Sequence, residues 1–167
     1  MQLRDARFLV VDDHQPMREI LKSLLFGLGA RHVDEARDAA VAFDMLRISR
    51  YDVLLTDYDM AGETGVQLTS KVRHAAQNPN RRMAVIMVTG RAEGPVILSA
   101  RDVGVDEYLI KPLTAASLCA KLDAVFGRRR PFIETETYIG PCRRRRTVDF
   151  DGPERRRDTA SPAARTA

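Results

Sequence analysis

Four short apolar runs in the sequence each end in polar side chains that could do chemistry. The runs are residues 8–11, 53–56, 84–88 and 108–110. The polar residues that follow them are Asp12 with Asp13, then Asp57, Thr89 and Lys111. If the runs are neighbouring parallel strands, their carboxyl ends share one edge of a sheet. Three carboxylates, one hydroxyl and one ammonium group would then meet in a single pocket.

Carboxylates crowded together in this way indicate a bound cation. They repel one another unless a cation lies among them, and hard oxygen ligands of this type suit Mg²⁺. A carboxylate beside a divalent cation can attack phosphorus, because the metal screens its repulsion from the incoming phosphoryl oxygens. The set therefore predicts a magnesium site with phosphoryl-transfer chemistry. Taken singly, an Asp or Thr at a strand end is often only a helix N-cap.

Strands and helices must alternate along the chain if these residues are to meet. Near-continuous apolar runs predict buried strands, and apolar residues at helical spacing predict helices. The predicted strands are 7–11, 33–36, 52–56, 83–88 and 106–110. The predicted helices are 16–28, 38–48, 66–75, 96–102 and 114–126, the last with Thr114 as its N-cap. Five such units with short connections predict an α/β fold, a five-stranded doubly wound parallel sheet with helices on both faces.

The composition is that of one soluble domain. At 167 residues the chain can bury one good core and is too short for two ordinary domains. No apolar stretch approaches the roughly 18 residues that a membrane helix needs. The first predicted strand begins almost at the N-terminus, which leaves no room for a signal peptide. We therefore expect a cytoplasmic protein with no membrane insertion.

The positive charge is concentrated in the C-terminal segment. The net charge is +4, but residues 128–167 hold 11 of the 27 basic residues, all arginine, and six of the 23 acidic residues. Residues 1–127 are therefore nearly neutral. The arginine runs and the lack of an amphipathic period predict a mostly disordered tail over 128–167. Residues 132–139 alternate apolar and polar side chains, so they could lie along the body when a partner is present.

The ordered set of strand-end residues resembles one protein family. Residues 5–127 resemble the receiver domain of bacterial two-component response regulators, of the stand-alone type found among chemotaxis regulators. The matching positions are Asp12-Asp13, Asp57, Met60, Gly65, Thr89-Gly90, Tyr108 and Lys111-Pro112. The resemblance implies a flavodoxin-like (βα)5 receiver domain over residues 1–127. It does not extend to the arginine-rich tail.

The resemblance also implies roles for the acidic residues. Asp13 and Asp57 would bind Mg²⁺ directly, with the backbone carbonyl of Asp59 as a third ligand and Asp12 acting largely through water. Asp57 would be the phosphoacceptor. The donor would be a phosphohistidine on a histidine kinase or a histidine phosphotransfer protein.

Two further residues would recognise the phosphoryl group, according to the same resemblance. Lys111 would pair with its oxygens, aimed by a cis Lys111–Pro112 peptide, and the Thr89 hydroxyl would donate a hydrogen bond. Thr89 would move toward the new dianionic group, and Tyr108 would rotate into the space left behind. In the family this coupling changes a surface that corresponds to about residues 94–127 here. The alternative is a half-buried tyrosine that stays fixed.

The loop after Asp57 departs from the family pattern. Ala61 stands where a proline is usual, which changes loop stiffness and removes no ligand. Asp59 would flank the route by which water attacks the acyl phosphate, and Arg91 would face it across the pocket mouth. We hypothesise that an ion pair between Asp59 and Arg91 tunes the lifetime of the phosphorylated state.

No effector domain is predicted after residue 127, since a helix-turn-helix module would need roughly 60 residues with apolar periodicity. We expect a signalling protein rather than an enzyme, with Mg²⁺-dependent self-phosphorylation and autodephosphorylation. It would act through phosphorylation-dependent contacts with a protein target that the sequence does not identify. The alternative is a receiver-switched binder of nucleic acid or another anionic surface, through Arg143–Arg146 and Arg155–Arg157. The complete acid pocket argues against a receiver that never takes phosphate.

Overall fold

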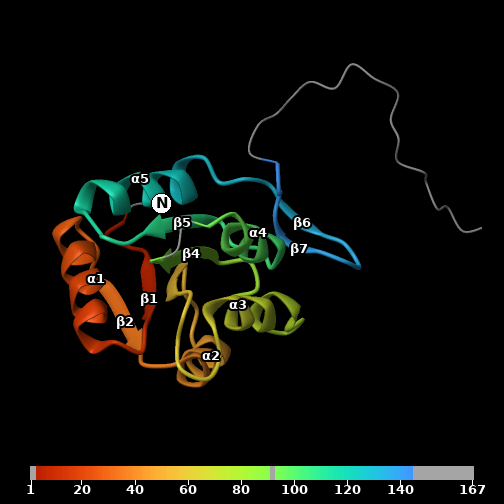
Figure 1. Ribbon diagram of the computed structural model, residues 1–167, viewed down its shortest axis with the longest axis horizontal. Helices are drawn as coiled ribbons and strands as arrows, with labels where there is room; N and C mark the ends of the chain where they lie inside the picture. Colours follow the sequence, from red (N-terminus) through yellow and green to blue (C-terminus); the bar gives the residue numbers. More distant parts are fainter. Residues whose placement is uncertain (1–2, 91–92, 145–167) are drawn as a thin grey trace, which may run out of the picture.

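The computed structural model describes residues 3–90 and 93–144, which form a five-stranded parallel sheet between two layers of helices (Figure 1). The strands lie in the order β2-β1-β3-β4-β5. Their bounds are Arg7–Val11 (β1), His32–Ala36 (β2), Val53–Asp57 (β3), Ala84–Thr89 (β4) and Glu107–Ile110 (β5). The helices are Gln15–Gly27 (α1), Ala39–Ile48 (α2), Gly65–His74 (α3), Gly94–Asp102 (α4) and Ala115–Gly127 (α5). The predicted doubly wound sheet is confirmed, and the predicted elements differ from these bounds by at most two residues.

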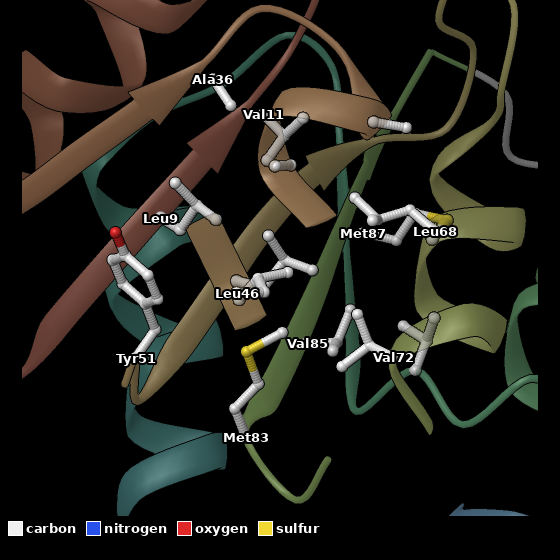
Figure 2. Close-up of a cluster of buried hydrophobic side chains, with 14 of the residues drawn as sticks. Leu9, Val11, Ala36, Leu46, Tyr51, Leu68, Val72, Met83, Val85 and Met87 are labelled. Atoms are coloured by element: carbon white, nitrogen blue, oxygen red, sulfur yellow. The ribbon is translucent and has the colours of Figure 1, made fainter. Parts of the chain in front are cut away.

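Alternation along the strands builds one apolar core on each face of the sheet. Leu9 and Val11 of β1 point to the face covered by α2, α3 and α4 (Figure 2). Phe8 and Val10 point to the opposite face, which α1 and α5 cover. All four side chains are fully buried, as expected for a central parallel strand that is covered on both faces. The helices therefore fix the height and tilt of the strand ends that carry the polar residues.

Local capping chemistry starts three of the helices. The Asp38 carboxylate accepts a hydrogen bond from the backbone N–H of Val41 at the start of α2. Thr64 and Gln67 form a capping box at the start of α3. Thr114 and Ser117 form another at the start of α5, which confirms Thr114 as the N-cap. Each cap satisfies backbone donors that the first helical turn leaves free, so the loops that enter these helices have defined ends.

The structure differs from the sequence prediction just after α5. Residues 128–142, which we call the C-terminal clasp, continue the folded body instead of leaving it. They contain a two-stranded antiparallel hairpin formed by β6 (Phe132–Glu134) and β7 (Ile139–Pro141) (Figure 1). The arginine runs at 145–146 and 155–157 lie outside the described residues.

Arginine side chains attach the clasp to the amino ends of β4 and β5. Arg129 donates to the Asp106 carboxylate at 2.9 Å and to the Met83 carbonyl at 2.9 Å. Arg130 donates to the Asp106 carbonyl at 2.6 Å and to the Val105 carbonyl at 3.2 Å. The first arginine run indicated a solvated tail, but two of its three guanidinium groups satisfy partly buried acceptors. This is the physical reason why the expectation of disorder fails for this stretch.

Within the described part of the chain, no helix has both the length and the apolar character that crossing a membrane would require.

Candidate functional site

Three acidic side chains converge at the carboxyl edge of the sheet. Asp12 and Asp13 follow the last residue of β1, and Asp57 is the last residue of β3. Pairing of Val11 with Thr56 across the two strands brings these ends level. One carboxylate oxygen from each residue lies within 4.8 Å of the other two. The predicted convergence of the three acids is therefore present.

Asp12 is fully buried and only half satisfied. One of its carboxylate oxygens, Oδ1, accepts the backbone N–H of His14 at 2.9 Å. The other, Oδ2, has no hydrogen-bond partner, and the nearest charge is the Lys111 ammonium at 3.5 Å. A buried carboxylate oxygen without a donor is costly unless a ligand or ion completes it. This oxygen is therefore available as a ligand for a cation.

Asp57 is buried to 8 % exposure and is held from two sides. Its Oδ1 accepts the backbone N–H of Tyr58 at 3.0 Å and the ammonium of Lys111 at 3.1 Å. Burial raises the pKa of the Asp57 carboxyl, the nearby Asp12 charge adds to that rise, and the Lys111 hydrogen bond and charge oppose it. The lysine therefore favours the ionised, nucleophilic form of Asp57 against the effects of burial and of the Asp12 charge.

Lys111 reaches the acids from the end of β5. Its backbone N–H donates to the Thr89 carbonyl at 2.8 Å, which fixes the end of β5 to the end of β4. The Lys111–Pro112 peptide is cis, as the family resemblance implied. Thr89 is itself 2 % exposed at the end of β4. Tyr108, three residues before Lys111, donates its hydroxyl to the Ile97 carbonyl of α4 at 2.9 Å.

The loop between β3 and α3 closes the other side of the pocket. The backbone N–H of Ala61 donates to Asp13 Oδ2 at 2.8 Å, which joins this loop to the loop after β1. Gly65 lies so close to the strand end that an added Cβ would collide with the Asp57 backbone carbonyl and approach the Thr56 hydroxyl. Only glycine allows this contact. The sequence match at Gly65 therefore has a steric cause in this chain.

The charges and ligand types of the pocket fit a divalent metal ion. Three carboxylates face one ammonium group, so the pocket lacks two positive charges when all four groups are ionised. All three acidic groups offer hard oxygen ligands, which suit Mg²⁺. The Oδ2 of Asp12, which has no hydrogen-bond partner, is one of these oxygens. The residues present therefore fit the magnesium ion that the sequence predicted.

Of the remaining predicted residues, some lie within the described part of the chain and others do not. Asp59 is exposed in the β3–α3 loop, two residues after Asp57. Arg91, its predicted partner, lies outside the described residues, so the Asp59–Arg91 pair stays a prediction. Arg143 packs over the Tyr138 ring at 4.1 Å and lies 3.6 Å from the Asp102 carboxylate.

The sequence reading missed one residue at the pocket. Arg18 of α1 donates to the backbone carbonyl of Asp12 at 2.9 Å. The sequence signal available for it was modest: one basic residue within the first turns of a helix that begins directly behind an acidic pair. It has only weak meaning before the fold is known, because basic residues on helices usually face solvent.

A comparison with protein-family models finds one match, which spans residues 8–123. The matching model is that of the response regulator receiver domain. The match ends before the clasp, so the clasp is additional to what the family model describes.

Curated relatives are similar over nearly their whole length. The chain is 38 % identical to chemotaxis protein CheY-3 of Vibrio cholerae over 125 residues, which is 75 % of this chain and 95 % of the relative. It is 39 % identical to chemotaxis protein CheY of Pseudomonas aeruginosa over 122 residues, or 73 % of this chain and 97 % of that protein.

Solved structures repeat the fold. The chemotaxis protein CheY4 of Vibrio cholerae superposes with a TM-score of 0.67 at 26 % identity, covering 72 % of this chain and 98 % of the other. The receiver domain of a sensor histidine kinase from Pseudomonas aeruginosa gives a TM-score of 0.64 at 28 % identity, covering 71 % and 94 %. That second structure is described with a magnesium ion coordinated in its active site cleft.

Proposed function

This chain belongs to the response regulator receiver domain family, and we propose that it accepts a phosphoryl group on Asp57 from a phosphohistidine donor. The donor would be a histidine kinase or a histidine phosphotransfer protein. The observation that carries the proposal is the contact between the Lys111 ammonium and Asp57 Oδ1 at 3.1 Å, inside a cluster of three carboxylates. A buried nucleophilic carboxylate with one cation beside it is what transfer of an anionic group requires.

The proposed reaction moves one phosphoryl group between two side chains. An ionised Asp57 oxygen attacks phosphorus, and the bond between phosphorus and the donor's histidine nitrogen breaks. That nitrogen leaves with the bonding electron pair and takes up a proton. Lys111 holds the Asp57 carboxylate before the transfer and pairs with the phosphoryl oxygens after it. Thr89, at the end of the neighbouring strand, donates its hydroxyl to one of the same oxygens.

We further propose that Asp12, Asp13 and Asp57 hold Mg²⁺, with the Asp59 backbone carbonyl as an additional ligand. When bound, the ion neutralises charge on the incoming phosphoryl oxygens. The fit is supported by the excess of two negative charges and by the unsatisfied Oδ2 of Asp12. Asp13 is also tied to Ala61, so metal binding and the conformation of the β3–α3 loop depend on one side chain.

The signal would reach a protein target through the surface formed by α4, β5 and α5, about residues 94–127. Thr89 and Tyr108 are the proposed switch pair. The Tyr108 hydroxyl bonds to Ile97, so its rotation would release a contact with α4. Leu98 and Ile110 are exposed to 49 % and 46 % and offer apolar contacts on this surface. Rotation of the tyrosine would thereby change what a partner meets beside these two residues.

Acetyl phosphate provides a direct test of the phosphoacceptor. Wild-type protein incubated with acetyl phosphate and Mg²⁺ should gain the mass of one phosphoryl group. The Asp57→Asn variant should gain none, because a neutral amide does not attack phosphorus. Intact mass spectrometry measures both, and addition of a chelator is the matched control for the metal. An unchanged mass for the wild-type protein in the presence of Mg²⁺ would contradict the proposal.

A further inference from the structure

Arg18 links the acidic loop to the edge of the sheet. Its Nη1 donates to the backbone carbonyl of Asp12 at 2.9 Å. Its Nε is buried without a hydrogen-bond partner and forms an ion pair with the Glu35 carboxylate of β2 at 3.7 Å, and the side chain is only 12 % exposed. Lys22, one turn further along α1, contacts the same Glu35 oxygen at 3.3 Å. Glu35 thus holds two basic side chains of α1, and only one of them touches the acidic loop.

The carbonyl that Arg18 binds belongs to the peptide between Asp12 and Asp13. This peptide is planar, so fixing its oxygen constrains the backbone on both sides of it. The Asp12 N–H bonds to the Ala36 carbonyl at a long 3.4 Å, and Asp12 itself is fully buried. The guanidinium therefore restrains the backbone from which the two carboxylates leave, in addition to the bonds that the His14 and Ala61 N–H groups donate to the carboxylates themselves. A guanidinium group is well suited to fixing a peptide carbonyl, because it is planar and presents several N–H donors in a rigid arrangement.

We infer that Arg18, oriented by Glu35, is a positioning residue that holds Asp12 and Asp13 in the geometry that binds the metal ion. This inference rests on the proposed function, since it concerns the same pocket. Arg18 touches neither the proposed metal nor the phosphoryl group, and it acts through the backbone of the two acids. Groups that orient metal ligands typically change metal affinity by tenfold or more when they are removed.

Charge and positioning predict opposite effects for Arg18, which makes the inference testable. Arg18 is a cation close to the pocket, so its charge alone disfavours a second cation there. If charge were its main effect, removing it would tighten Mg²⁺ binding. If positioning is its main effect, removing it loosens the two carboxylates and weakens Mg²⁺ binding. A purely structural brace between α1 and β2 would lower the stability of the fold and leave the affinity for Mg²⁺ unchanged.

The experiment measures Mg²⁺ binding to the full chain by titration calorimetry. The variants are Arg18→Met and, as matched control, Lys22→Met, which removes the same charge from Glu35 without touching Asp12. We expect Arg18→Met to weaken Mg²⁺ binding by about tenfold and Lys22→Met to leave it within about twofold of wild type. Thermal unfolding without metal, recorded for each protein, separates lost affinity from lost folding.

A second variant covers the case in which Arg18→Met does not fold. Glu35→Gln keeps the guanidinium and its hydrogen bond to Asp12 but removes the charge that orients it, so we expect a smaller loss of Mg²⁺ affinity, about threefold. Equal or tighter binding by Arg18→Met, or equal losses in Arg18→Met and Lys22→Met, would overturn the inference. If Arg18→Met does not fold, Mg²⁺ affinity of Glu35→Gln equal to that of wild type would overturn the inference instead. Failure of wild-type protein to bind Mg²⁺ would instead contradict the proposed function.

Discussion

Asp106 and Asp12 are buried carboxylates at the amino and carboxyl ends of the strands. Their hydrogen bonds show how a structural ion pair differs from a candidate metal site. Asp106 is 3 % exposed, and its oxygens accept hydrogen bonds from Arg73, Arg129 and the backbone of Val85. Asp12 is fully buried, yet its Oδ2 has no hydrogen-bond donor. A satisfied network stabilises a fold, whereas an unsatisfied buried acceptor marks a place where a ligand completes the structure. Asp106 therefore forms part of a structural network, whereas Asp12 keeps an oxygen available for the metal ion that we propose.

Tyr51 supplies a prediction about alkaline pH. It is 6 % exposed and donates its hydroxyl to the Asp34 carboxylate at 2.9 Å. Burial, with the Asp34 hydrogen bond and charge adding to it, raises the pKa of Tyr51 from 10.0 to about 12. The folded state thus keeps the phenol proton more tightly than the unfolded state does. The stabilisation is complete below pH 10 and is lost as the pH rises through 12.

The Tyr51→Phe variant isolates this effect, because phenylalanine has no proton to lose. The stability advantage of wild type over Tyr51→Phe should shrink by about 1.4 kcal/mol between pH 8 and pH 11. Urea unfolding of both proteins at the two pH values measures it, and the variant corrects for every other group that titrates. Parallel stability profiles for the two proteins would show that Tyr51 ionises normally.

At the scale of elements, the parallel sheet explains why the site could be predicted so closely. Four of the five strands are short apolar runs, and a residue that could do chemistry ends each of these strands or follows it directly. Asp57 and Lys111 are 54 positions apart, yet β3 and β5 both flank β4, so their ends lie together. Local sequence patterns fix such positions because the topology of a doubly wound sheet is nearly invariant.

The clasp could not be predicted in the same way, because its contacts are long-range and polar. Arg73 lies on α3, where a basic residue near the helix end indicates exposure, yet its side chain is fully buried. It donates to the carbonyls of Gly104, Arg81 and Met83 and to Asp106. Burial lowers the pKa of Arg73 to about 10, and the Asp106 charge opposes that effect, so the group stays cationic at neutral pH. The acceptors around Arg73 come from segments that are distant in the sequence, so no local pattern predicts that this side chain is buried.

Replacement of Arg129 tests how much the clasp contributes to the stability of the fold. Replacing it with methionine removes the donor to Asp106 Oδ1 and leaves a buried carboxylate with fewer partners. We expect a loss of about 2 kcal/mol in the free energy of unfolding. Arg128→Met is the matched control, since the neighbouring Arg128 side chain makes no hydrogen bond or ion pair with the described residues. It should change stability by less than about 0.5 kcal/mol. Chemical unfolding of the full chain measures both, and equal losses would exclude a specific role for Arg129.

At the scale of the whole molecule, the two edges of the sheet have separate tasks. The acid pocket lies at the carboxyl edge, where strand ends and loops can respond to a ligand. The clasp lies at the amino edge, where Arg130 binds the carbonyls that precede β5. Strand β5 connects the two, since it begins directly after the carbonyls that Arg130 binds and ends at Ile110, directly before Lys111. The clasp therefore anchors the amino end of β5, and the carboxyl end of the strand, where Ile110 pairs with Thr89, lies beside the acid pocket.

This division predicts where the folded unit ends. A chain shortened to residues 1–127 would lose Arg129, Arg130 and the Phe132 ring that packs 5.3 Å from the Arg73 guanidinium. The carbonyls of Val105 and Asp106 would lose the Arg130 donor, and the Met83 carbonyl would keep only its bond from Arg73. We therefore expect a loss of about 3 kcal/mol in the free energy of unfolding.

A chain shortened to residues 1–144 keeps the whole clasp, including the bond from Arg130 to the Cys142 carbonyl. It should unfold within about 0.5 kcal/mol of the full chain. Urea unfolding of the three lengths at one pH makes the comparison, and magnesium-dependent mass gain with acetyl phosphate shows which of them retain the pocket. If the 1–127 form matched the full chain in stability, the clasp would be an attachment to a domain that ends with α5. If 1–127 alone is weakened, the folded unit extends to residue 142, beyond the stretch that the family model matches.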